Sequence, residues 1–151
     1  MVIINGLNEI EKYLGKEIGV SSWHTVTQDQ INKFAEATGD FQWIHTDVER
    51  CSKESPYKTT IAHGYLTLSM APHFMDQIFK VENVSMGINY GLNKVRFSSH
   101  VPVNSKLRLR VKLTDFFKKE YTARMTLKLT FEIEGQEKAV CVAESLALLK
   151  A

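Results

Sequence analysis

The sequence predicts an α+β protein in which an antiparallel β-sheet wraps around a long apolar helix. Two observations carry this prediction. The segment from Gly64 to about Phe79 is apolar on almost every face, which is typical of a buried central helix. The last third of the chain alternates apolar and polar residues with a period of two, which indicates strands buried on one face. Helices and strands that are segregated along a chain favour the α+β class.

The size and composition suit an ordinary globular protein. At 151 residues the chain is long enough for one core, and we expect a single domain over residues 1–151. The formal charge of +2 gives no reason to expect a nucleic acid or a membrane surface as a partner. The run Val2-Ile3-Ile4 is too short for the apolar part of a signal peptide. Two cysteines do not make a disulfide framework, so a cytoplasmic protein is the simplest expectation.

The first third of the chain contains one well-defined helix. We expect a short helix or turn over residues 5–14 and a strand within residues 16–26, where the alternation is imperfect. Thr27 is a good N-cap, and Gln30 three residues later completes a capping-box pattern. Gly39 stands where a left-handed residue would end the helix. The apolar face of this helix would be formed by Ile31, Phe34, Ala35 and Thr38.

The middle of the chain divides into a polar and an apolar segment. Residues 40–60 are polar and irregular, which indicates a loop with at most one turn of helix. A loop of that length inside a compact domain is usually functional or mobile, and we expect this one to be functional. The central helix then begins at Gly64, and Pro72 within it predicts a kink or a break near Ala71.

Four strand regions make up the rest of the chain. Residues 106–113 alternate without a fault, and residues 121–133 carry apolar side chains on one face and polar side chains on the other. Glu134-Gly135-Gln136 is a candidate hairpin turn. Residues 139–149 are more continuously apolar, which favours a strand covered on both faces. With a further strand over residues 84–97, interrupted by a glycine, these segments predict an antiparallel meander of at least four strands.

Two short segments carry the candidate chemistry. Asp40 and His45 lie just beyond the end of the predicted helix, so a carboxylate and an imidazole are a few residues apart. Such a pair can move protons during the addition or removal of water. Gly64 would lie at the start of the central helix, where an unpaired backbone N–H can hold negative charge on a carbonyl oxygen. The plainer alternative for Asp40 is that its side chain caps the following turn.

The two segments resemble a known family. The run Gly-Asp-Phe-Gln-Trp-Ile-His from Gly39 to His45, with Ile-Ala-His-Gly-Tyr-Leu from Ile61 to Leu66, is similar to the MaoC-like dehydratases. That family has the hot-dog fold and includes (R)-specific enoyl-CoA hydratases. The Gln-Trp-Ile-His variant looks most like the subgroup named after nodulation protein N. The well-characterised hydratases of the family carry Asn-Pro where this chain has Gln42-Trp43.

The resemblance implies a hot-dog fold and a hydro-lyase that hydrates an enoyl-CoA or dehydrates an (R)-3-hydroxyacyl-CoA. It implies Asp40, His45 and Gly64 as catalytic residues, and no cofactor other than the coenzyme A of the substrate. We expect no metal, because none of the scattered histidines has metal-ligand spacing with cysteines or carboxylates. Which of Asp40 and His45 is the base and which the acid stays open. The family also implies a homodimer and an acyl-CoA or acyl-carrier thioester as the partner. The residues expected to bind the substrate are Gln42, Trp43, His63 and Tyr65.

Two other functions fit a hot-dog domain. A thioesterase of this fold usually needs a carboxylate on the central helix, and the only acidic residue there is Asp76, near the far end. A non-catalytic module that binds acyl thioesters would need neither Asp40 nor His45. The basic run from Lys106 to Lys112 could contact the phosphates of coenzyme A, although a solvated outer face of the sheet is the simpler interpretation.

Overall fold

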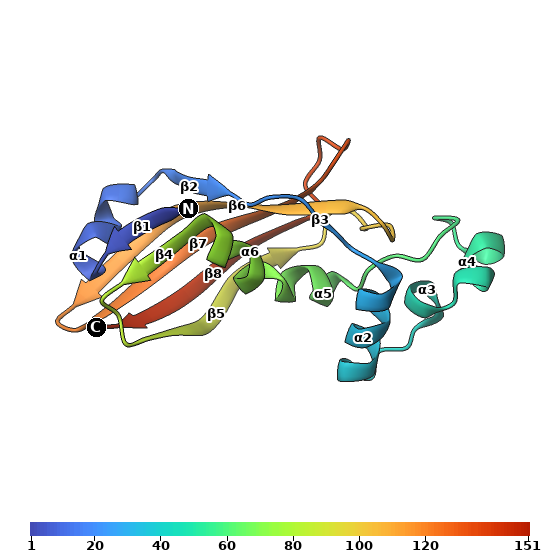
Figure 1. Cartoon of the computed structure of the whole chain (residues 1–151), viewed down its shortest axis with the longest axis horizontal. Coiled ribbons are helices and arrows are strands. Elements are labelled where there is room, and N and C mark those ends of the chain that lie inside the picture. Colours follow the sequence, from blue (N-terminus) through green and yellow to red (C-terminus); the bar gives the residue numbers. More distant parts are fainter.

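A six-stranded antiparallel sheet forms the body of the molecule (Figure 1). The computed structural model describes residues 1–151, and the hydrogen-bonded strand order is β2-β6-β7-β8-β5, with β3 also paired to β6. Strands β6, β7 and β8 form a meander, whereas β5 joins the far edge beside β8, so the expected four-strand meander has only three consecutive strands. The strands are β2 (Glu17–Val20), β3 (His24–Thr25), β5 (Met86–Arg96), β6 (Lys106–Lys119), β7 (Thr122–Ile133) and β8 (Cys141–Lys150).

The alternation of side chains gives the sheet one apolar face. In β7 every second residue from Ala123 to Ile133 is buried, and in β6 the same holds from Leu107 to Leu113. The residues between them on the opposite face are mostly polar, as the period of two predicted. In β5 the pairing with β8 shifts register between Asn89 and Gly91, at the glycine that interrupts the predicted strand.

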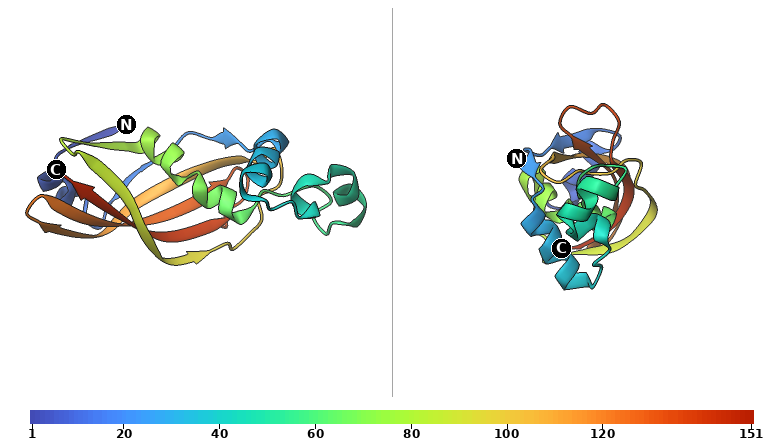
Figure 2. Two further views of the ribbon diagram at one scale, coloured as in Figure 1. Left: turned by 90° about the horizontal axis from the view of Figure 1, so that it is seen from below. Right: turned by 90° about the vertical axis from the view of Figure 1, so that its right-hand side faces the viewer.

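Two helices in line form the central helix and pack on the apolar face of the sheet (Figure 2). They are α5 (Gly64–Ser69) and α6 (Ala71–Ile78), and the break between them lies where Pro72 predicted it. Pro72 is tolerated in the first turn of α6 because the N–H groups there have no partner within the helix. Phe74 is fully buried and meets Phe131 of β7 edge to face at a centroid distance of 6.4 Å. The helix is not apolar on every side, since Tyr65 is 70% exposed.

The N-terminal segment adds a small second sheet. Strand β1 (Val2–Asn5) pairs in parallel with β4 (Phe79–Glu82), which directly follows the central helix. The expected short helix within residues 5–14 is present as α1 (Leu7–Ile10) and a 3₁₀ turn, η1 (Glu11–Tyr13). Strand β1 was not predicted, because its four residues are too few to show a period of two.

Three helices form an arm that extends beyond one end of the sheet (Figures 1 and 2). They are α2 (Gln28–Thr38), α3 (Trp43–Thr46) and α4 (Val48–Glu54). Helix α2 begins and ends as predicted, because the Thr27 hydroxyl accepts the N–H of Gln30 and Gly39 ends it in the left-handed region with a φ of 79°. No helix in the structure has the length and apolar character needed to cross a bilayer.

The prediction of a loop over residues 40–60 is wrong, because α3 and α4 lie within it. The side chain of Asp47 caps α4 by accepting the N–H of Arg50 at 2.9 Å. Ion pairs four residues apart, Glu49 with Lys53 and Arg50 with Glu54, then support the exposed face of the helix. The capping residue and the ion pairs can be found in the sequence, but the segment is so polar that its composition alone indicates a loop and not α4.

The packing of Phe74 gives a test of the fold. Replacing this fully buried ring by alanine, Phe74→Ala, should lower the free energy of unfolding by about 3–5 kcal/mol, because it leaves a cavity between the central helix and the sheet. Urea unfolding followed by circular dichroism measures this change. The matched control is Phe117→Ala on β6, where the ring is 58% exposed and truncation should cost much less. Equal losses in the two variants would contradict the described core.

Candidate active site

The end of α2 fixes the position of Asp40. Because Gly39 stops the helix in a left-handed conformation, the chain turns sharply and Asp40 begins a new direction. The Oδ1 atom of Asp40 accepts the N–H of Gln42 at 3.2 Å, so the side chain does cap the turn before α3. The second carboxylate oxygen makes no hydrogen bond with the protein and Asp40 is exposed, so a site role and the capping role are compatible.

A short hydrogen bond fixes the ring of His45. The imidazole is buried at 7% exposure, and its Nδ1 lies 2.7 Å from the carbonyl oxygen of Ile61. A carbonyl can only accept, so Nδ1 carries a proton, and in the neutral ring Nε2 then has a free lone pair. The N–H of Ile61 in turn donates to the carbonyl of Ile44 at 3.1 Å, which ties α3 to the segment before the central helix. The ring of His45 is thus held in one orientation, in which the neutral form presents Nε2 as a base.

The structure brings Asp40, His45 and His63 together. One ligand-type atom of each lies within 4.8 Å of the others. The Nε2 of His63 donates to the main-chain carbonyl of Asp40 at 2.9 Å, and its ring stacks on that of His45 with a centroid distance of 3.9 Å and an angle of 24°. The carboxylate and the imidazole that the sequence proposed as an acid/base pair are therefore neighbours in space.

The same three residues could be considered as a metal site, but their geometry fits a metal poorly. Metal ligands must direct their lone pairs at one point about 2 Å away. The rings of His45 and His63 are nearly parallel, so lone pairs in the two ring planes run side by side. One nitrogen of each ring is also taken by a main-chain carbonyl, that of Ile61 or that of Asp40. An acid/base pair describes this cluster better.

Gly64 and His45 line one cavity of about 370 Å³. Gly64 is the first residue of α5, and its N–H has no acceptor in the fold. A Cβ at this position would lie 3.0 Å from the ring of Phe97, so any larger residue would require that ring to shift. The other residues lining the cavity are Tyr57, Ile61, Ala62, Thr67, Phe97, Ser99, His100, Val101, Val140 and Cys141.

The cavity walls set the protonation of two groups. Burial lowers the pKa of His45 below its usual value, and the neighbouring His63 acts in the same direction, whereas the bond to Ile61 and the charge of Asp40 oppose the shift. His45 is therefore neutral at pH 7. Burial also raises the pKa of the Cys141 thiol to about 11, so this cysteine is no nucleophile at neutral pH although it lines the cavity.

The other predicted site residues lie around the cavity without lining it. Gln42 is exposed at the N-terminus of α3, and its side chain makes no hydrogen bond. Trp43 is half-buried beneath the guanidinium of Arg50, which lies 4.1 Å from the ring centroid. Tyr65 points to solvent and meets the ring of Phe97 edge to face. No role was predicted for Phe97, because no feature of the sequence indicates a contact between residue 97 and Gly64.

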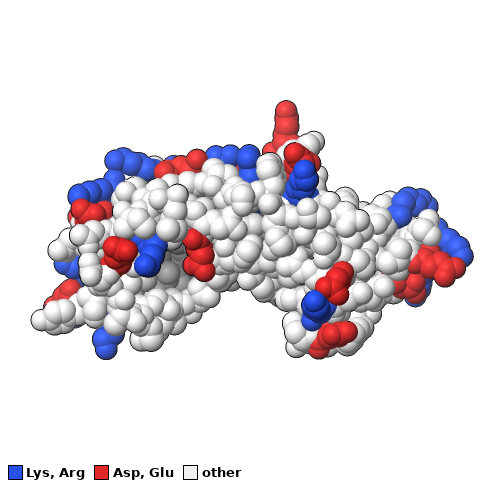
Figure 3. Space-filling view, in the orientation of Figure 1, with Lys and Arg blue, Asp and Glu red and all other residues white.

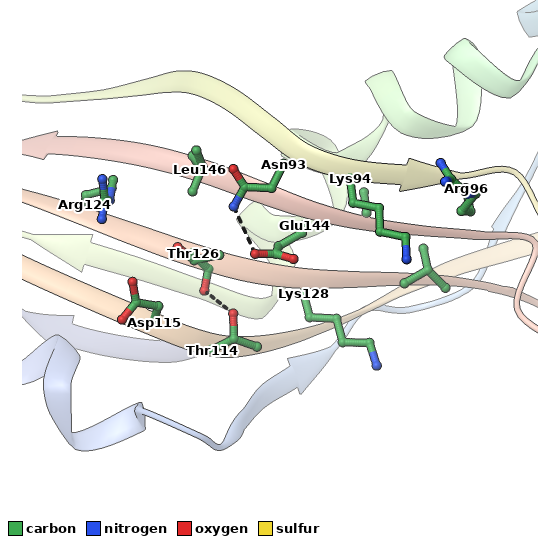
Figure 4. Close-up of a pocket in the computed structure, with 12 residues that line it drawn as sticks. Asn93, Lys94, Arg96, Thr114, Asp115, Arg124, Thr126, Lys128, Glu144 and Leu146 are labelled. Carbon is green, nitrogen blue, oxygen red and sulfur yellow. Dashed lines mark hydrogen bonds between the residues drawn. The ribbon is translucent and has the colours of Figure 1, made fainter.

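The largest hollow of the molecule lies elsewhere, on the outer face of the sheet (Figure 4). It has a volume of about 690 Å³, and Figure 4 shows it lined mainly by charged and polar side chains of β5 to β8 around Glu144. No histidine or cysteine lines it, so it offers no acid/base pair of the kind found beside Gly64. On the same face Arg108 and Arg110 pair with Glu132, which supports the interpretation of a solvated surface.

Comparison with known proteins identifies the family. A family model described as a MaoC-like domain matches residues 9–135. The fold is the hot-dog fold, and the chain belongs to the MaoC-like dehydratase family, as the two sequence segments indicated. A 3-hydroxyacyl-thioester dehydratase Z from Mycobacterium tuberculosis is 47% identical over 133 residues, which are 87% of each chain. Nodulation protein N from Rhizobium leguminosarum bv. viciae is 39% identical over 95% of this chain and 91% of its own.

Solved structures support the fold. A monoamine oxidase regulatory protein from Archaeoglobus fulgidus superimposes with a TM-score of 0.81 and 27% identity, over 99% of this chain and 98% of its own. An R-hydratase from Pseudomonas aeruginosa superimposes with a TM-score of 0.72 over 94% of this chain and 83% of its own. At 18% identity the second match bears on the fold alone.

The lowered pKa of His45 predicts a loss of stability in acid. The folded protein keeps His45 neutral, whereas the unfolded chain takes up a proton near pH 6.5, so stability is complete above that pH and falls as the pH drops toward the folded pKa. The slope from this residue is at most about 1.4 kcal/mol per pH unit. Urea unfolding at pH 7.5 and 5.5 should show a smaller loss in His45→Gln than in the wild type. The same loss in both proteins would contradict the assignment.

Proposed function

We propose that this protein is a 3-hydroxyacyl-thioester dehydratase that also catalyses the reverse reaction, the hydration of a trans-2-enoyl thioester. The observation that carries the proposal is the convergence of Asp40 and His45 beside the cavity that His45 shares with Gly64. Water addition to a double bond conjugated with a thioester needs a proton carrier and a donor to the carbonyl oxygen. The relative at 47% identity bears the name of the same reaction class.

His45 is the proton carrier in this mechanism, because its Nε2 is unprotonated when the cycle starts. In the hydration direction, a water held between the carboxylate of Asp40 and Nε2 of His45 attacks C3 and gives one proton to Nε2. The imidazolium then supplies one proton to C2, so water has been added across the double bond and the ring is neutral again. Asp40 orients the water and stabilises the imidazolium. Dehydration follows the same steps in reverse.

Gly64 supplies the donor for the thioester oxygen. While C2 is being protonated or deprotonated, negative charge develops on the carbonyl oxygen, and the Gly64 N–H, which donates to no other acceptor in the fold, can donate a hydrogen bond to that oxygen. One such donor is worth about 3–4 kcal/mol of transition-state stabilisation. A side chain at this position would also press on the ring of Phe97, which lines the cavity and would have to shift.

The substrate is an acyl thioester, and its carrier is coenzyme A or an acyl-carrier protein. We assign it the (R) configuration at C3, following the family to which the chain belongs. Both cysteines of the chain are buried and unpaired, which suits action in the reducing cytoplasm.

The thioesterase alternative has little support. Its candidate carboxylate, Asp76, is exposed on α6 and does not line the cavity that holds His45 and Gly64. A module that only binds acyl thioesters would have no need of the neutral, fixed ring of His45.

The edge strand β5 supports a homodimer. Its 11 residues pair on one side with β8 only, and all but one of them are exposed. Ile88 is 47% exposed and Tyr90 61%, with Met86 and Leu92 similar. The middle of the face in Figure 3, along which β5 and the central helix run, carries few charged side chains. A long apolar edge strand is a template for pairing with another strand. In a two-fold symmetric dimer, β5 of each protomer would cover the β5 edge of the other.

The catalytic assignment predicts the behaviour of two variants. Asp40→Asn keeps the oxygen that accepts the N–H of Gln42 but removes the charge, and His45→Ala removes the proton carrier. Each should lower the kcat for hydration of crotonyl-CoA by about 10²–10⁴-fold without unfolding the protein. The assay follows loss of the enoyl absorbance, and chiral analysis of the product tests the (R) configuration.

Matched controls for these variants are available outside the cavity. Asp76→Asn and His73→Ala alter exposed residues of α6 and should keep wild-type activity. Full activity in Asp40→Asn or His45→Ala would overturn the assignment. Loss of activity in Asp76→Asn, with release of free thiol from saturated acyl-CoA, would favour the thioesterase.

The proposed interface is tested by charge on the edge strand. Ile88→Lys should convert the dimer into a monomer, because an ammonium group would be buried between the two β5 strands without a partner. Light scattering after gel filtration measures the mass. Ile3→Lys on β1, where isoleucine is 45% exposed, is the control and should remain a dimer. A dimeric Ile88→Lys variant, or a monomeric wild type, would refute this interface.

A further inference from the structure

His63 is the most enclosed polar group of the site. It is 2% exposed and occupies the N-cap position of α5, directly before Gly64. Its ring lies between that of His45, at a centroid distance of 3.9 Å, and that of Phe34 of α2, at 4.9 Å. A side chain so enclosed cannot contact a substrate without a rearrangement of the arm, so the expected substrate-binding role does not fit its position.

The hydrogen bonds of His63 determine where its proton lies. Nε2 faces the main-chain carbonyl of Asp40 at 2.9 Å and must be the donor. Nδ1 has no partner, and it is the only buried side-chain nitrogen or oxygen in the chain of which this is true. Protonation of Nδ1 would bury both an unpaired donor and a charge, which is costly. His63 therefore has one fixed donor, Nε2–H, and one buried nitrogen without a partner.

The donor bond bears directly on Asp40. Residue 40 follows a left-handed glycine and is exposed, and its side chain is held within the protein only through the N–H of Gln42. The bond from His63 attaches the main chain of Asp40 to a residue 23 positions later, at the start of the central helix. The bond therefore connects the helical arm to the residue directly before Gly64. The distance between the carboxylate of Asp40 and the Gly64 amide thus depends on His63.

The stacked ring bears on His45. Its nearly parallel face covers one side of the His45 imidazole and keeps water from that side. Since Nδ1 of His45 is fixed by Ile61, the two contacts together determine both the plane and the rotation of the ring. Neither nitrogen of His63 is free to pass a proton on, because one is bonded to a carbonyl and the other is sealed in.

We propose that His63 is a positioning residue for the dehydration, in which its Nε2–H holds the main chain of Asp40 and its stacked ring holds and shields the ring of His45. This inference rests on the proposed function of Asp40 and His45. It differs from a direct role in catalysis, since His63 touches neither the substrate nor the transferred proton. The two contacts use different parts of one side chain, so substitutions can separate them.

Two variants test the two contacts. His63→Phe keeps a flat ring against His45 but removes the donor, so Asp40 loses its attachment; kcat for crotonyl-CoA should fall about 10- to 100-fold while KM changes less than about threefold. His63→Gln keeps a donor near the position of Nε2 but removes the ring. It should keep kcat within about threefold of the wild type at high pH, while water regains access to His45.

The pH profile separates a positioning role from a merely structural one. The base form of His45 is its neutral form, so activity is lost as the pH falls through its pKa. In His63→Gln the acidic limb of kcat/KM should move to higher pH, toward 6.5, because burial no longer depresses protonation of His45 to the same degree. In His63→Phe that limb should move less, because the aromatic ring that shields His45 is kept. Asp40 and His63 are the charged or titratable groups that act on His45, and Tyr57, His100 and Cys141 line the same cavity.

The outcomes are distinct. His73→Phe, the same substitution at an exposed histidine of α6, is the control and should match the wild type in kcat and in pH profile. A His63→Phe variant that is folded and keeps full kcat would overturn the inference while leaving the proposed function intact. If His63→Phe does not fold, an unmoved acidic limb in His63→Gln overturns it. A wild-type protein that turns over no 3-hydroxyacyl or enoyl thioester would overturn the proposed function, and this inference with it.

Discussion

The hydrogen bond between Nδ1 of His45 and the carbonyl of Ile61 is the interaction on which the site depends. It joins the helical arm to the segment that leads into the central helix, and it decides which nitrogen of the ring carries the proton. The acceptor is itself well fixed. Main-chain bonds from Ala62 to Val101 and from Val103 to Thr60 attach this segment to the connection between β5 and β6. The chemistry of the ring is thus determined by the backbone of the hot-dog fold.

Gln28 on α2 shows how the arm is held in place around this bond. Its amide nitrogen donates to the carbonyl of His45 at 2.7 Å, and its amide oxygen accepts the hydroxyl of Thr60, which is fully buried. One side chain therefore connects all three segments of the site: α2, α3 and the approach to α5. A half-buried amide with both ends satisfied favours a single arrangement of these segments. The cavity beside Gly64 keeps its shape because the arm is attached at several points.

Much of the fold was accessible from the sequence, because local signals and the final structure agree. Thr27, Gln30 and Gly39 delimit α2 as predicted, and the period of two in residues 121–133 is the burial pattern of β7. The failures have physical reasons. Helix α4 was missed since its stability comes from the Asp47 cap and from ion pairs rather than from an apolar face. The place of β5 beside β8 depends on pairing between strands far apart in the chain, which no local pattern reports.

The residues of the candidate site, too, were only partly predictable from the sequence. Asp40, His45 and Gly64 could be proposed from two motifs, whereas the contacts of His63 and the ring of Phe97 over Gly64 required coordinates. Nitrogen NMR of histidine-labelled protein at pH 7.5 tests the central claim most directly, because the chemical shifts of Nδ1 and Nε2 report which one carries the proton. We expect His45 to be neutral with the proton on Nδ1. A proton on Nε2, or a charged ring at that pH, would contradict the account.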